Sequence, residues 1–284
     1  MVFEMYWRHF SIGFVIYLAV RIGHAFYKKF KTSTVDKTVT ETKSVAPEFD
    51  SEDSGEELVP ALPRDLQYVP LKFNEIPVEE SLRKSRHFYE LMNARRTVRH
   101  FSTRDVPKEV IYNLIKTAGT APSGAHTEPW TFALVSSAET KKKIREIIEE
   151  EEEINYRKRM GNEWTTDIKP LRTNWIKEYL TDAPHLILVF KQTHSQKPNG
   201  TKKLHYYNEQ SVVLAAGFLL AAIQNAGLVS LTSTPLNCGP ALRALLNRPT
   251  SEKLSLLLPV GYPAKDCKVP DLERKSLDNI MLEY

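Results

Sequence analysis

The alternation of hydrophobic and polar positions predicts helices and strands from residue 79 onward. Between Ser81 and Asn93, large apolar residues recur at helical spacing, and Pro107 stands where a second helix would begin. We expect each of these helices to pack one face against a second layer. Three short apolar runs are typical of buried strands, namely residues 131–135, 186–190 and 254–260. The pattern therefore predicts one α+β domain that contains a sheet.

Residues 212–226 form a further predicted helix, in which Ala, Leu and Val are found almost all round. A helix that is apolar on nearly every face is buried on most of its surface. We expect this one in the core of the domain or at a subunit interface. No short internal repeat is visible along the chain, which argues against a solenoid.

The N-terminal segment has a different apolar pattern. Residues 10–20 are almost wholly apolar, and with Arg21 and His24 tolerated the segment extends to Tyr27, close to the roughly 20 residues that span a bilayer. Three lysines follow within residues 28–31, and the positive-inside tendency then places the rest of the chain in the cytoplasm. We expect residues 1–31 to form a single membrane anchor. A segment lying in the membrane surface is the alternative.

Residues 32–67 are rich in Ser, Thr, Glu and Asp and contain few large apolar side chains. Such a segment cannot bury enough surface to offset the entropy lost on folding, so we expect a disordered tether. The folded domain is then expected to comprise residues 68–284.

Composition narrows the classes of function. The 284 residues are 42% hydrophobic, enough for a sizeable core, and the formal net charge is only +4. No basic block is interleaved with aromatic residues, which argues against nucleic-acid binding. Cys238 and Cys267 are the only cysteines, so neither a disulfide framework nor a cysteine-rich metal site is expected, and a reducing compartment fits best. Glycine-rich phosphate loops, a GxSxG motif and HExxH spacing are also absent from the sequence, and we assign no metal.

Three arginines within five residues are a candidate for anion binding. Arg95, Arg96 and Arg99 follow a predicted helix. Guanidinium groups donate to phosphate oxygens in bidentate fashion and stay charged in any environment. The cluster therefore favours a phosphate, although ordinary surface arginines would give the same pattern.

Two loops could approach a planar ligand. Residues 120–126 are mostly small and precede a predicted strand, so their backbone amides could come close to a ring, but an ordinary turn uses the same residues. Residues 231–237 supply clustered hydroxyl groups near a predicted strand end. These could bond the polar edge of a ring system or cap a helix.

A run of five glutamates, residues 149–153, leads into a segment that could close over a ligand. Glu152 and Tyr156 stand four residues apart and therefore share one face of a helix. Lys177, on a second helical segment, could add the opposite charge. The three side chains together would match the ammonium and carboxylate of a free amino acid. A solvated acidic helix face is the alternative.

Four separated stretches of the chain resemble the iodotyrosine deiodinase family of nitroreductase-like flavoproteins. They are residues 121–130, the glutamate-rich segment that ends at Tyr156, residues 174–179 and residues 234–240. The resemblance covers about residues 68–284, and the predicted anchor and tether also have counterparts in the family. Two mild departures keep a hydroxyl group: Thr97, where the family often has serine, and Ser233, which interrupts a run that can be all threonine.

This resemblance implies a central, mainly antiparallel sheet flanked by helices, and an intertwined homodimer with FMN at its interface. It implies that reduced FMN removes iodide from mono- and diiodotyrosine, yielding tyrosine and salvaging iodide. Electrons would come ultimately from NADPH, through a separate reductase. A broad flavin nitroreductase or quinone reductase is the alternative on the same fold, and a non-catalytic, membrane-tethered sensor of aromatic amino acids is a further one.

The resemblance also implies roles for individual residues. One group would hold the FMN phosphate and ribityl chain: Arg95, Arg96, Thr97, Val98, Arg99 and Arg274. The flavin ring would contact Thr232, Ser233 and Thr234, together with Pro122 and Ser123 of the partner subunit. The Ala125 backbone amide would bond the substrate phenolate, while Glu152, Tyr156 and Lys177 would hold its amino-acid end. Thr234, as a hydroxyl donor to flavin N5, and Ala125 would act in the chemical step.

Overall fold

The computed structural model describes Arg21, Pro60, residues 62–196 and residues 200–284. All the helices and strands given below belong to one compact unit, Pro60–Tyr284. The predicted anchor lies outside the described residues except for Arg21, and so does most of the predicted tether. Within the described part of the chain, no helix combines the length and the apolar character needed to cross a membrane.

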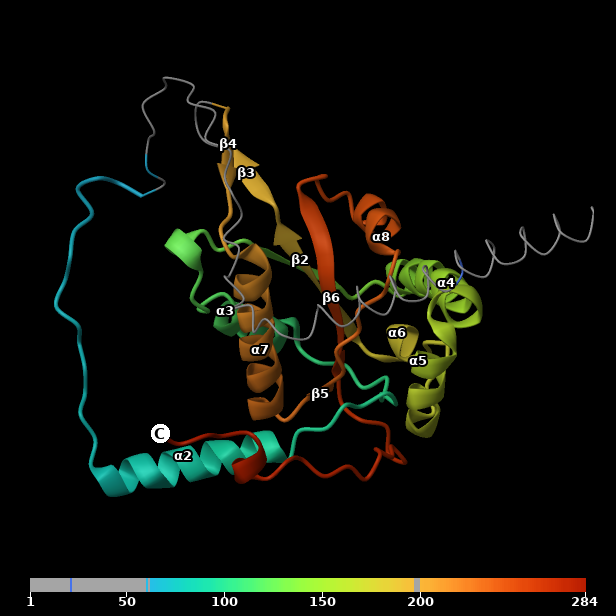
Figure 1. Ribbon diagram of the computed structural model, residues 1–284, viewed down its shortest axis with the longest axis horizontal. Coiled ribbons are helices and arrows are strands. Elements are labelled where there is room, and N and C mark those ends of the chain that lie inside the picture. The colour runs from blue at the N-terminus through green and yellow to red at the C-terminus, as the bar shows by residue number, and fades with distance from the viewer. Residues whose placement is uncertain (1–20, 22–59, 61, 197–199) are drawn as a thin grey trace, which may run out of the picture. The chain divides into compact units, whose positions relative to one another are not determined.

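A four-stranded sheet forms the centre of the domain, with strand order β1-β2-β6-β5 and antiparallel pairing throughout (Figure 1). Its strands are β1 (Trp130–Val135), β2 (His185–Gln192), β5 (Val229–Ser230) and β6 (Glu252–Gly261). A separate hairpin is formed by β3 (His194–Gln196) and β4 (Lys202–Leu204). The three predicted apolar runs are β1, β2 and β6, which confirms the α+β class and the antiparallel sheet. The strand end predicted before residue 231 corresponds to the two-residue β5, whereas the hairpin was not predicted.

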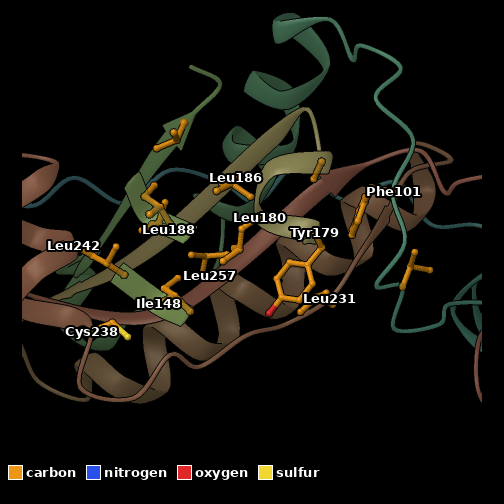
Figure 2. Packing of buried hydrophobic residues seen from close by; sticks show 14 of the residues in the cluster. Phe101, Ile148, Tyr179, Leu180, Leu186, Leu188, Leu231, Cys238, Leu242 and Leu257 are labelled. Atoms are coloured by element: carbon orange, nitrogen blue, oxygen red, sulfur yellow. The ribbon is translucent and has the colours of Figure 1, made fainter. Parts of the chain in front are cut away.

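Strand β2 shows why the sequence of a central strand is a continuous apolar run: its side chains are buried on both faces of the sheet. Successive side chains of a strand point to opposite faces of a sheet. Leu186 and Leu188 enter one hydrophobic core together with Ile148 (Figure 2), whereas Ile187 and Val189 enter a second core on the other face. Because both faces are covered, an apolar residue is needed at every position.

Helices supply the other side of each core (Figure 1). On the face of Ile187, α3 (Lys108–Ala118) packs against α7 (Asn208–Asn225). Three helices contribute side chains to the other core: α4 (Ala138–Ile154), α6 (Tyr179–Asp182) and α8 (Gly239–Leu245). Pro107 directly precedes α3, as predicted from the sequence.

Helix α2 (Val78–Asn93) matches the predicted helix, but its predicted packing only in part. None of its residues is buried, and Leu82 and Phe88 are 59% and 54% exposed. Its C-terminal end contacts α7, where the Gln224 side-chain amide donates to the Leu91 carbonyl at 3.1 Å, while the rest of its apolar face is exposed in the described chain. Three large apolar side chains of α7 are exposed as well: Val213, Leu214 and Phe218.

Between α4 and α6 the chain forms the short elements that surround the candidate site. Helix α4 runs directly into a π-helical turn, η2 (Asn155–Arg159). It is followed by α5 (Gly161–Ile168) and a single turn, η3 (Lys169–Leu171). Turns of the π type are rare in proteins, and those that occur often lie at functional sites.

Candidate active site

A cavity of about 290 Å³ lies where the end of α4 and η2 face the loop that follows β5. Seven residues singled out in the sequence line it: Arg99, Glu152, Tyr156, Lys177, Thr232, Ser233 and Thr234. Segments that are distant in the sequence therefore meet around one space. The structure brings the predicted carboxylate, phenol and amine together, while the roles assigned to them stay predictions.

Glu152 and Lys177 form a buried ion pair in the wall of this cavity. Nζ of Lys177 lies 3.6 Å from Oε2 of Glu152, and the two residues are only 6% and 7% exposed. Lys177 also donates to the Asn174 carbonyl, and the Asn155 side-chain amide donates to Oε1 of Glu152 at 3.3 Å. Burial lowers the pKa of Lys177, and the Glu152 carboxylate opposes that shift. Because buried charges are costly unless paired, each of these charges depends on the other in the described chain.

Tyr156 stands in an aromatic wall beside this ion pair. Its ring meets Trp164 and Trp175 edge to face, at centroid distances of 5.4 and 6.1 Å. Nζ of Lys177 lies 5.2 Å from the centroid of the Tyr156 ring. Burial raises the pKa of the Tyr156 phenol. Its hydroxyl is therefore protonated at neutral pH and can donate a hydrogen bond to an anion.

The hydroxyl-bearing loop after β5 is held from two sides. Ser233 exchanges backbone hydrogen bonds of 2.9 and 2.8 Å with Leu257 of β6. On the other side, the Asn237 side-chain amide donates to Oδ1 of Asn155 at 3.2 Å, and Asn155 donates to the Leu236 carbonyl at 3.4 Å. The π-helical turn and this loop thus form one connected wall.

The arginine segment extends the sheet along its β5 edge. Thr97 pairs with Ser230 in parallel, and the Val98 amide donates to the Ser230 carbonyl at 3.1 Å. Val98 is buried in the core, whereas Arg99 lines the 290 Å³ cavity. Arg99 and Thr97 also line a larger cavity of about 830 Å³, whose wall includes residues 268–272.

The other two arginines point elsewhere. Arg95 lines a separate small cavity against α7, and Arg96 donates to the Pro270 carbonyl. Arg274 donates to the carbonyls of Asn93 and Arg95, at 2.8 and 2.6 Å, so the C-terminal segment crosses the arginine segment. The described chain therefore does not gather the three guanidinium groups in one cavity.

The small-residue loop lies away from both cavities. Pro122, Ser123 and Ala125 line neither of them in the described chain, and Ala125 is exposed. Ala125 lies in a single turn, η1 (Gly124–His126), with a φ of 49°, a strained conformation for a residue with a side chain. A side chain at Gly124 would come within 3.1 Å of the Tyr206 carbonyl oxygen. Gly124 therefore packs closely against the backbone of Tyr206.

Several residues of the cavity wall were not predicted. Tyr179 is 7% exposed, and burial raises its pKa to about 12, while a hydrogen bond with Ser233 opposes the shift. Its only signal was its place in the stretch 174–179. Four apolar wall residues follow α4: Met160, Trp164, Ile168 and Leu171. Apolar residues on short helices resemble ordinary core residues, so no sequence signal marked them.

These groups together offer an ammonium, a carboxylate, a phenolic donor and several hydroxyl groups beside an aromatic wall. The set can bind a ligand that carries both charges on one end and an aromatic ring on the other.

Comparisons with known proteins agree with this geometry. The nitroreductase family profile matches residues 92–262. Iodotyrosine deiodinase 1 of Homo sapiens is 63% identical over 218 residues, which cover 77% of this chain and 75% of that protein. The Mus musculus enzyme is 64% identical over 217 residues, covering 76% of each chain. A crystal structure of oxidized iodotyrosine deiodinase bound to FMN and 3-iodo-L-tyrosine matches with a TM-score of 0.61 and 32% identity, over 69% of this chain and 98% of that one. The chain therefore belongs to the nitroreductase family and, within it, to the iodotyrosine deiodinases.

Proposed function

We propose that this chain removes iodide reductively from mono- and diiodotyrosine with the electrons of FMN. The observation that carries the proposal is the buried Glu152–Lys177 ion pair, which shares one cavity wall with Tyr156. A reductase that accepts nitroaromatics or quinones in general has no use for paired opposite charges at its substrate. The 63% identity to the human iodotyrosine deiodinase 1 supports the same function.

Recognition of the amino-acid end follows from these two charges. The substrate ammonium binds the Glu152 carboxylate, and the substrate carboxylate binds the Lys177 ammonium and the Tyr156 hydroxyl. When the ion pair separates, the substrate ammonium takes the place of Lys177 beside Glu152, and the substrate carboxylate takes the place of Glu152 beside Lys177. Neither buried charge is therefore left unpaired. A halophenol without an amino-acid end offers no such exchange.

The chain also offers groups that fit FMN. Arg96 and Arg274 donate to carbonyls, yet a guanidinium carries five N–H groups and keeps others for a phosphate. We assign the phosphate and ribityl chain to the arginine segment and the C-terminal segment: Arg95, Arg96, Thr97, Val98, Arg99 and Arg274. The flavin ring is assigned to Thr232, Ser233 and Thr234. When bound, FMN supplies the electrons that cleave the carbon–iodine bond.

Two residues are assigned to the chemical step. The Thr234 hydroxyl donates to flavin N5, and the pairing of Ser233 with Leu257 fixes the backbone beside it. The Ala125 amide would donate to the phenolate oxygen of the substrate and so steer the chemical step. Because Ala125 lines neither cavity of the described chain, a homodimer is part of the proposal. Ala125 of the partner subunit would complete the site, together with Pro122 and Ser123 of the partner subunit.

Membrane attachment and electron supply are further parts of the proposal. Residues 1–31 anchor the chain in a membrane, and residues 32–67 tether the catalytic domain in the cytoplasm. The chain has no glycine-rich dinucleotide motif, so a separate reductase is proposed to pass electrons from NADPH.

Anaerobic iodide release tests this function. Dithionite-reduced protein that carries FMN is mixed with diiodotyrosine, and we expect free iodide and tyrosine to form. A nitroaromatic compound under the same conditions is the comparison. Reduction of the nitroaromatic without iodide release would replace the proposal with a broad nitroreductase. Purified protein that holds no flavin would rule out both.

A further inference from the structure

A row of charged side chains runs along one face of α4. The spacing places four residues on that face: Lys141, Arg145, Glu149 and Glu152. This face meets the segment that carries Lys177 and α6. At one end of the row, Nζ of Lys141 donates to the carbonyls of Thr181 and Ala183, at 3.0 and 2.6 Å. At the other end, Glu152 pairs with Lys177.

Arg145 and Glu149 form the middle of the row. Arg145 donates from Nε to Oε1 of Glu149 at 2.7 Å and from its terminal nitrogen to the Thr181 hydroxyl at 2.9 Å. The same Oε1 of Glu149 accepts the backbone N–H of Lys177 at 2.6 Å. One carboxylate of α4 therefore holds the backbone of Lys177, and a second one, Glu152, holds its side chain.

We infer that Glu149 is a positioning residue, which fixes the backbone of Lys177 so that its ammonium meets the carboxylate of an amino-acid substrate, and that Arg145 orients Glu149. A lysine side chain is long and flexible, so its ammonium stays in place only if its backbone does. Glu149 and Arg145 are 22% and 26% exposed, so water competes only in part with their bonds. The inference rests on the proposed function, because it assigns Lys177 to the substrate carboxylate.

The role predicts an effect that depends on the substrate. Glu149→Ala frees the Lys177 backbone, so the KM for iodide release from 3-iodotyrosine should rise about fivefold, with little change in kcat. 2-Iodophenol lacks the amino-acid end, so its kcat/KM should stay within about twofold. Glu149→Gln should recover most of the loss, because its amide oxygen still accepts the Lys177 N–H.

A second ion pair of α4 supplies the matched control. Glu146 lies 3.9 Å from Lys142 across one helical turn, and their side chains are 63% and 74% exposed. Glu146→Ala therefore removes an ion pair of the same spacing and should leave the KM for 3-iodotyrosine and the kcat/KM for 2-iodophenol unchanged. If Glu149→Ala does not fold, Arg145→Ala takes its place. This variant keeps the Glu149 carboxylate that accepts the Lys177 N–H, but it removes the guanidinium that orients that carboxylate.

The possible results separate the inference from the proposed function. Wild-type protein that releases no iodide from 3-iodotyrosine would remove the proposed function itself. Active wild-type protein with a selective rise in KM in Glu149→Ala, or in Arg145→Ala, supports the inference. Equal losses on both substrates, no loss at all, or no recovery in Glu149→Gln would overturn it.

Discussion

In the proposed function, the buried ion pair of Glu152 and Lys177 serves substrate recognition more than stability. Replacing such a pair by apolar residues is often neutral or even stabilising, so it contributes little to folding. A ligand that carries both charges can replace both partners. The shared face of Glu152 and Tyr156 was visible in the sequence as a spacing of four residues. The contact of Glu152 with Lys177 depends on tertiary structure and could only be guessed from charge.

Each charge of the pair should matter separately for binding. Glu152→Gln and Lys177→Gln should each raise the Kd of 3-iodotyrosine about tenfold or more, because a charge-assisted bond away from water contributes roughly 1.5 to 3 kcal/mol. Quenching of flavin fluorescence on titration with 3-iodotyrosine measures this Kd. Glu150→Gln, at an exposed position of the same helix, is the control. Equal weakening by Glu150→Gln would indicate a general acidic field instead of a specific contact.

Tyr179 makes the stability of the domain sensitive to alkaline pH. Burial raises its pKa to about 12, from an ordinary value of 10.0. The folded protein therefore keeps a proton that the unfolded chain loses, so the stabilisation is full below the ordinary pKa and is lost as pH rises toward the raised one. Between about pH 9 and 11, the free energy of unfolding of the wild type should fall about 1 kcal/mol more than that of Tyr179→Phe. Urea denaturation at both pH values measures the difference, and equal falls would mean that Tyr179 does not hold its proton this way.

At the scale of elements, Asn155 joins the π-helical turn to the loop after β5. Its side chain is 1% exposed and bonds Asn237, the Leu236 carbonyl and Glu152. The π turn begins at Asn155, so the direction of the next residue, Tyr156, depends on this junction.

Loss of the Asn155 side chain should affect both stability and binding. Asn155→Ala removes the part-buried hydrogen bonds to the Leu236 carbonyl and the Asn237 amide and the buried one to Glu152, which should lower the free energy of unfolding by about 1 to 3 kcal/mol. Asn162→Ala, at an exposed position of α5, should change it by less than about 0.5 kcal/mol. Denaturant titration and the Kd of 3-iodotyrosine measure the two effects. Unchanged affinity in a folded Asn155→Ala protein would show that the junction does not position Tyr156.

How well the sequence predicted an element depended on its length and its surroundings. Strands β1, β2 and β6 were found because the sheet is covered on both faces and needs apolar residues throughout. Strand β5 has two residues, too few for an alternating pattern, so only its end before residue 231 was predicted. The π turn shifts hydrogen bonds without changing the order of apolar residues, so no pattern could show it. The arginine cluster was found as a motif, but closeness in sequence did not determine which cavity each guanidinium faces.

At the scale of the whole molecule, exposed apolar side chains lie on α2 and α7. On α7 they form a strip in which Gly217 lies between larger neighbours: Val213, Leu214 and Phe218. Soluble monomers rarely expose large contiguous apolar patches. The proposed homodimer would cover this strip and bring Ala125 of the partner subunit to the cavity.

A charge in the strip should separate the proposed dimer. Phe218→Glu should shift the protein toward a monomer in sedimentation analysis and reduce both FMN content and iodide release, because each site would lose the partner's residues. Lys142→Glu, at an exposed position of α4, should leave the protein dimeric and active. A fully active Phe218→Glu monomer would show that the partner contributes nothing to the site, and an intact dimer would place the interface elsewhere.

Under the proposed function, preference for the amino-acid end is the property that would set this cavity apart from a general reductase site. The ratio of kcat/KM for iodide release from 3-iodotyrosine to that from 2-iodophenol measures it in the wild-type protein alone. Two charge-assisted bonds, each contributing roughly 1.5 kcal/mol or more, predict a ratio of at least about 100. A ratio within about threefold of unity would show that Glu152 and Lys177 do not read the amino-acid end, and would contradict the function proposed for this chain.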